Sequence, residues 1–364
     1  MNESPRILET ASSINELSRQ RAVNPLDPAV ARRWCAAALG QGQAQQVPAY
    51  AAQLYSQEKD PLRKAEWARL GAMAAFRLLH LEQALAAYTV STGHLCELAE
   101  SGRAPAPLPC SDAPNAFASG EAEALLWATG AALARAGFAA FPYSGTLLGL
   151  VREGSLLPFD KDIDLAIWSE DFGRCGAWLE QQGWRPLRDL PPYANFRAFL
   201  HPQSKLTLDL IGLKRYPHEK TMQGGFELAG YPEQYQSLRT FPLVELVQRA
   251  TPAGEVWFVK ESDPLLTALY GDWRTPNPAW DGMVSCGGLS EPTLLTRCYA
   301  SDRLLERWFL GRLDRAWAYA HQILLKDPSD FSALRVRQSL GRLLALSNPG
   351  ALNWPPKLTP GVPR

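Results

Sequence analysis

The segment YSGTLLGLVREGSLLPFDKDIDLAIW, residues 143–168, joins a glycine-containing turn to a run of alternating residues. Its first part follows the short apolar run AAFP and predicts a strand that ends at Gly145 and gives way to a short helix. Its last part, DIDLAIW, has the period of two that is typical of a half-buried strand. Three aspartates, Asp160, Asp162 and Asp164, lead into that strand.

The sequence around this segment predicts a small domain with a mixed sheet. A helical pattern ends at Gly137, and a second one fills EDFGRCGAWLEQQGW, residues 170–184. Two alternating runs, NFRAFLHP and KLTLDLIGLKR, predict a hairpin across residues 201–204. We therefore expect an α+β fold in which helices cover one face of a mixed sheet.

The aspartates of these strands predict a metal site. Strand side chains alternate between faces, so Asp162 and Asp164 share one face. Asp209 lies in the second run of the hairpin, and if the two strands are neighbours, the three carboxylates converge. Unpaired carboxylates at one place raise each other's pKa, and a divalent cation removes that repulsion. Because the ligands are oxygens only, we predict Mg²⁺ or Mn²⁺ and no zinc.

The glycine turn predicts a phosphate site beside the metal. Ser144, Gly145 and Thr146 stand where a strand passes into a helix, and backbone N–H groups at a helix start attract phosphate. Arg152, at the far end of the same helix, and Lys161, inside the acidic run, are candidates to neutralise further phosphate oxygens. Magnesium held by one or two carboxylates commonly completes its shell with phosphate oxygens, so the two predictions support each other.

Both ends of the chain predict helices with a repeated pattern. DPAVARRW starts at Asp27 and DPLRKAEW at Asp60, and a period in the low thirties is typical of tetratricopeptide (TPR) repeats. GRLDRAWAYAHQILLKDPSD, from Gly311, has similar spacing. Alanine- and leucine-rich hairpins without repeat ancestry are the alternative, and either offers a surface for a partner protein. The predicted division is a flexible N-terminus (1–26), TPR-like helices (27–100), a proline-rich linker (101–116), a central domain (117–298), TPR-like helices (299–347) and a tail (348–364).

The composition narrows the class of partner. Hydrophobic residues make up 46% and charged residues 20%, as in a soluble globular protein. Lys+Arg and Asp+Glu both number 37, which argues against nucleic acid or an anionic membrane as the main partner. We expect no transmembrane segment and no signal peptide, and hence a cytoplasmic protein. The six cysteines are scattered and fit no zinc spacing, so we expect reduced thiols.

The segment GTLLGLVREGSLLPFDKDIDLAI, residues 145–167, closely resembles the signature of the LicD family of phosphocholine transferases and of fukutin and fukutin-related protein. LTLDLIGL, GEVWFVKESDP and LLTALYGDWRTPNP extend the resemblance to about Pro278. It implies a nucleotidyltransferase fold. It also implies Mg²⁺-dependent transfer of a phosphorylated head group, with release of CMP, from a CDP-linked donor such as CDP-choline or CDP-ribitol. The acceptor would be a hydroxyl of a cell-surface glycan or its lipid-linked precursor.

The resemblance implies a role for each matching residue. Asp162 and Asp164 would bind Mg²⁺ on the donor diphosphate, and Asp209 would complete the metal site or take the acceptor proton. Gly145 and Thr146 would face phosphate. Arg152 would stabilise the leaving CMP or hold the adjacent loop.

The sequence departs from the family pattern beside the acidic run. Position 161 is Lys where bacterial members often have Asp, and position 159 is Phe where they often have Trp. Lys161 could instead pair with Asp160, so Asp160 is given a supporting or structural role. We interpret the corner from Tyr270 to Trp273 as packing rather than a contact with substrate.

Two other functions stay open. A nucleotidyltransferase moving NMP from an NTP to a small molecule or protein would use the same fold and metal site, and would differ only in the phosphorus attacked. A non-catalytic TPR-like scaffold is the second alternative. The intact run of Asp162 and Asp164, together with Asp209, argues against a scaffold.

Overall fold

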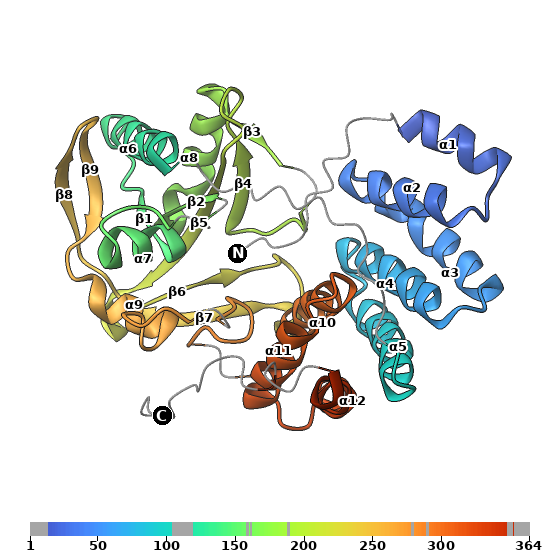
Figure 1. Ribbon diagram of the computed structural model, residues 1–364. Helices are drawn as coiled ribbons and strands as arrows, with labels where there is room; N and C mark the ends of the chain where they lie inside the picture. Colours follow the sequence, from blue (N-terminus) through green and yellow to red (C-terminus); the bar gives the residue numbers. More distant parts are fainter. Residues whose placement is uncertain are drawn as a thin grey trace.

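A central mixed sheet and a helical region built from both ends of the chain make up the protein (Figure 1). The structure, a computed structural model, describes residues 14–103, 119–157, 160, 162–187, 190–277, 280–288, 291–347 and 352. The predicted α+β class is confirmed. Lys161, most of the predicted linker and all but residue 352 of the predicted tail lie outside the described residues.

The central sheet is mixed, as predicted. Its parallel pair is β2 with β5, and the remaining strand pairs are antiparallel. The predicted hairpin across residues 201–204 joins β4 to β5. A separate hairpin, β8–β9, packs beside α6. The strands are β1 (Phe141–Pro142), β2 (Asp162–Trp168), β3 (Arg185–Pro186), β4 (Phe196–Leu200), β5 (Thr207–Tyr216), β6 (Thr221–Phe226), β7 (Ser237–Pro242), β8 (Leu246–Thr251) and β9 (Gly254–Val259).

Helices α6 (Ser119–Arg135) and α8 (Ser169–Gln181) cover the apolar face of this sheet. The alternation of β2 places Ile163, Leu165 and Ile167 on that face, where they are buried among residues of both helices. The aspartates of β2 therefore point to the opposite face. On that side α7 (Ser144–Arg152) packs against β2 and against α9 (Ser262–Tyr270).

The repeated Asp-Pro pairs mark helix starts. Asp27 caps α2 and Asp60 caps α4, each followed by proline in the first helical position. Helices at both ends are thus confirmed, and their TPR character stays a prediction. The helices are α1 (Ile14–Val23), α2 (Pro28–Gly40), α3 (Val47–Gln57), α4 (Pro61–Arg77), α5 (Leu81–Glu100), α10 (Leu294–Phe309), α11 (Leu313–Lys326) and α12 (Phe331–Ser347).

The predicted flexible stretch 1–26 lies partly outside the described residues, which begin at Ile14. From Ile14 onward it forms α1, whose Leu17 is buried against the α2 core. The Trp34 indole donates to the Ser18 hydroxyl at 3.1 Å, and the Arg21 guanidinium lies 3.8 Å from the centre of the Trp34 ring.

The two helical ends pack together and onto the sheet. α10 and α12 both contact α5, and Arg69 of α4 pairs with Asp302 of α10 at 3.0 Å. Tyr299 of α10 stacks on Phe226, and its hydroxyl lies 2.6 Å from that of Tyr193. The predicted boundary between residues 298 and 299 therefore falls inside α10, whose buried faces serve both regions. None of the helices within the described ranges is long and apolar enough to span a membrane.

Candidate functional site

The register of the parallel pair brings two carboxylates together. Asp164 of β2 lies directly opposite Asp209 of β5, and Asp162 lies opposite Thr207. Asp164 is 3% exposed and Asp209 is 1% exposed. The two strands are therefore neighbours, as the prediction of converging carboxylates required. Asp162, nearer the start of β2, is also buried.

The glycine turn fixes the position of Asp164. The Gly145 N–H donates to Asp164 Oδ2 at 3.0 Å, and the Asp164 N–H donates to the Thr146 hydroxyl at 2.8 Å. Ser144 adopts a positive φ of 46°, which is strained for a residue with a side chain and which starts the tight entry into α7. Gly145 and Thr146 thus both hold Asp164, and Thr146 is buried; that they also face phosphate stays a prediction.

A fourth carboxylate lies beside Gly145. A Cβ atom at position 145 would make van der Waals contact with Asp160 Oδ1 and with Asp164 Oδ2, at 3.4 Å from each. Asp160 and Asp164 therefore lie on the same side of the glycine turn. Asp160 belongs to the cluster, which sequence alone left undecided.

The cluster is electrostatically unsatisfied. Burial, followed by the charge of Asp162, raises the pKa of Asp160 to about 7. Burial raises the pKa of Asp164 well above its usual range, and Asp162, Asp209 and Asp160 each add to that effect. Asp160 Oδ2 and Asp164 Oδ1 are buried without a hydrogen-bond partner among the described residues. Such a cluster favours a positive charge close to it.

The donor atoms fit a hard divalent cation, but a full protein ligand set is not preformed. Within the described ranges, no three His, Cys, Asp or Glu side chains are grouped so as to hold a metal ion. Asp162 lies two residue pairs before Asp164 in the register, opposite Thr207, and metal binding by Asp162, Asp164 and Asp209 stays a prediction. Mg²⁺ needs only one or two carboxylates when phosphate oxygens supply the rest, and the unpartnered oxygens suit that arrangement.

Arg152 and the corner after α9 border the site. The Arg152 Nε donates to Glu153 at 2.7 Å and its Nη1 to the Trp273 carbonyl at 3.1 Å. These contacts agree with the alternative in which Arg152 holds the local loop. Trp273 is buried, as expected of packing, but against α9, where its indole donates to Asp263.

Two residues near the site escaped the sequence analysis. The Tyr270 hydroxyl lies 3.3 Å from that of Ser144, although Tyr270 was interpreted as packing. Arg239 of β7 is buried and lines a cavity that also contains Ser144 and Ile211. No motif marks Arg239, because only the tertiary fold brings β7 to the first turn of α7.

The comparison with protein families agrees with this geometry. A model of the LicD/FKTN/FKRP family, nucleotidyltransferase domain, matches residues 137–221. The matched range holds the glycine turn and all four carboxylates, and it confirms the predicted resemblance. A nucleotidyltransferase domain of this type indicates a transferase. A comparison with curated proteins found no match.

Proposed function

We propose, from the LicD-type nucleotidyltransferase domain at residues 137–221, that the protein is a Mg²⁺-dependent phosphotransferase. It moves a phosphorylated head group, such as phosphocholine or ribitol phosphate, from a CDP-linked donor to a hydroxyl of a cell-surface glycan or its precursor. CMP is the leaving group. The helical ends offer a surface on which the acceptor or a partner protein binds.

The observation that carries this proposal is the pairing of Asp164 with Asp209. Two buried carboxylates face each other on parallel strands, and one of them keeps an unpartnered oxygen. A structural role for such a pair would require positive partners, since like charges at this spacing repel. A donor diphosphate with its cation supplies both the positive charge and the phosphate oxygens.

Each residue has a defined task in the proposed reaction. Asp164, oriented by the Gly145 N–H, and Asp162 would hold Mg²⁺, which supplies charge neutralisation on the diphosphate. The acceptor oxygen attacks the head-group phosphorus, and the bond between that phosphorus and the bridging oxygen of CMP breaks. Asp209 completes the metal site or takes the acceptor proton. Catalysis then rests on positioning and electrostatics rather than on a covalent intermediate.

The test measures CMP release from CDP-choline, CDP-ribitol and CDP-glycerol with Mg²⁺ and a sugar or polyol acceptor. We expect release from at least one donor, and an approximately thousandfold loss of kcat/KM in Asp164→Asn. The control is Glu121→Gln, an exposed acid of α6. Pyrophosphate release from ATP or CTP instead would favour the nucleotidyltransferase alternative, and full activity in Asp164→Asn would contradict both.

A further inference from the structure

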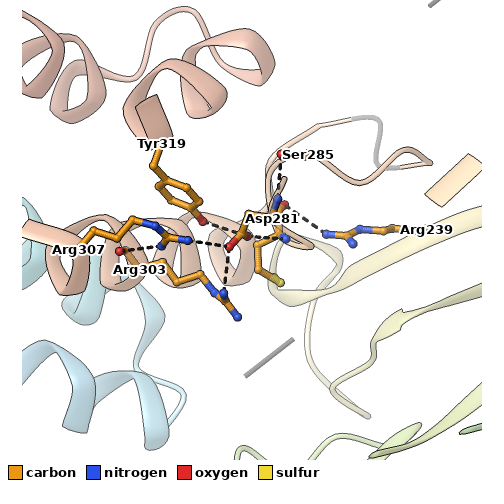
Figure 2. A network of polar contacts seen from close by, with 7 residues as sticks. Arg239, Asp281, Ser285, Arg303, Arg307 and Tyr319 are labelled. Atoms are coloured by element: carbon orange, nitrogen blue, oxygen red, sulfur yellow. Dashed lines mark hydrogen bonds and ion pairs between the residues drawn. The ribbon is translucent and has the colours of Figure 1, made fainter. Parts of the chain in front are cut away.

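Arg239 is a buried arginine that has no acidic partner among the described residues. It is 6% exposed and lies on β7, with its Nη2 donating to the Met283 carbonyl at 3.2 Å (Figure 2). Its Nε is buried and has no hydrogen-bond partner in the part of the chain that the structure describes. No described carboxylate forms an ion pair with it. Its other polar contact is the Cys286 thiol, which carries no full charge.

This arrangement is costly unless an anion completes it. A guanidinium stays positively charged throughout the physiological pH range. Burying a charge without a counter-charge costs several kcal/mol, so buried arginines are ordinarily paired. A nearby acid, Asp281, is already bound by Arg303 and Arg307 (Figure 2). The described residues therefore leave no counter-charge for Arg239.

The cavity at Arg239 is lined by residues that are close in sequence to the carboxylate site. Its lining includes Ser144, which precedes the glycine that holds Asp164, and Ile211, which follows Asp209 by two residues on β5. Two residues along a strand span about 7 Å, so the cavity begins roughly one phosphate group away from Asp209. Phe226 and Trp280 add aromatic walls.

The loop that orients Arg239 is fixed by the C-terminal helices. Met283, whose carbonyl receives the Arg239 hydrogen bond, also donates its N–H to Asp281 at 2.9 Å. Asp281 is in turn bound by Arg303 of α10 at 2.9 Å and by Tyr319 of α11 at 3.1 Å. The guanidinium is therefore held in place before any ligand arrives, as preorganised recognition requires.

We propose that Arg239 is the anion-binding residue of a subsite beside the carboxylate cluster, and that it binds an oxyanion, phosphate or carboxylate, of the substrate. A guanidinium presents paired N–H donors that match such groups. Assigning this oxyanion to a donor or an acceptor rests on the proposed function, whereas anion binding itself does not. The buried positive charge disfavours a quaternary ammonium, so a CDP-alditol fits this site better than CDP-choline.

Thermal melting with inorganic phosphate tests the subsite directly. In magnesium-free buffer the carboxylate cluster repels anions, and we expect 10 mM phosphate to raise the Tm of the wild type and of Asp164→Asn. Arg239→Met keeps an unbranched side chain of similar reach without the charge, and we expect no rise. The matched control is Arg249→Met, an exposed arginine of β8, which retains the wild-type response. Equal stabilisation of Arg239→Met and wild type would overturn the proposal.

A second variant keeps the proposal testable if Arg239→Met does not fold. Arg239→Lys keeps the charge but loses the planar pair of donors, and we expect about tenfold weaker phosphate binding. Unchanged phosphate affinity in this variant would overturn the proposal. CMP and glycerol 3-phosphate, added as separate probes, identify the source of the oxyanion. The compound whose Tm shift disappears in the Arg239 variant carries the group that Arg239 binds.

The two proposals fail separately. If no donor releases CMP but the phosphate response depends on Arg239, the proposed function is wrong and the anion subsite stands. If CMP is released and the phosphate response is independent of Arg239, the subsite is wrong and the transferase stands.

Discussion

Two buried aspartates of this protein lie in opposite electrostatic surroundings. Asp164 in the sheet is 3% exposed, and Asp281 between the sheet and the C-terminal helices is 4% exposed. Burial raises the pKa of Asp164, and its acidic neighbours raise it further. Burial would also raise the pKa of Asp281, but Arg303, Arg307 and its hydrogen bonds outweigh that effect, so its pKa lies below the usual value (Figure 2).

The difference separates an acid that supports the fold from one that we propose binds a ligand. Asp281 has its counter-charges within the chain, and the network ties the loop from 280 to 288 to α10 and α11. Among the described residues, the charged groups that act on Asp164 are all acidic, and one backbone N–H, that of Gly145, donates to it. Buried acids of the second kind are typical of functional sites, because the missing counter-charge is what they bind.

The largest expected effect on stability follows from neutralising Asp281. Asp281→Asn removes the carboxylate that pairs with Arg303 and Arg307 and leaves two guanidinium groups in a buried site. We expect the free energy of unfolding to fall by about 3–5 kcal/mol in urea titration. A loss below 1 kcal/mol would show that the network is not what holds this loop.

Glu306 of α10 is a third buried acid, and we expect its substitution to have an effect on stability between those of Asp281 and Asp164. Burial, opposed by Arg69 and assisted by Asp302, raises its pKa from 4.5 to about 7. Since the folded state binds the proton more tightly than the unfolded state, the stability that it contributes at low pH is lost as pH rises from about 4.5 through 7.

Glu306→Gln should therefore flatten the dependence of stability on pH. We expect the variant to be more stable than wild type at pH 8, by about 1–3 kcal/mol, and no more stable at pH 4.5. Urea titrations at both values measure this, with the exposed Glu255→Gln of β9 as the control. A variant less stable than wild type at pH 8 would mean that Glu306 has a counter-charge after all.

The smallest expected effect on stability follows from neutralising Asp164. Asp164→Asn removes repulsion within the cluster and keeps an oxygen that can accept from the Gly145 N–H. Without magnesium at pH 8 we expect the free energy of unfolding to stay the same or to rise by about 1 kcal/mol. A loss comparable to that of Asp281→Asn would contradict the distinction between the two acids.

The sequence predicted what depends on local pattern. Alternation located β2 and β5 and placed Asp162, Asp164 and Asp209 on one face, and the Asp-Pro pairs marked the starts of α2 and α4. The family-like segment around the glycine turn is likewise a local signal.

What the sequence could not predict depends on distant contacts. The hydrogen bond from the Gly145 N–H to Asp164 joins residues nineteen positions apart. It depends on the orientation of the Asp164 side chain, which no sequence pattern predicts. In the sequence, nothing distinguishes Arg239 and Asp281 from ordinary surface residues. Both are buried by the packing of β7 and α10 in the folded protein. α1 packs against Trp34 of another helix, and the predicted boundary falls inside α10 because that helix contacts both α5 and, through Tyr299, the sheet residue Phe226.

Magnesium binding by the wild type and by Asp164→Asn, followed as the change in Tm at pH 8 with and without 10 mM Mg²⁺, decides whether the carboxylate cluster binds a cation. If it does, magnesium raises the Tm of the wild type and of the exposed-acid control Glu121→Gln, and leaves that of Asp164→Asn unchanged, because only a ligand of the folded state stabilises it. Equal shifts in wild type and Asp164→Asn, or no shift in the wild type, would contradict a cation site at Asp164.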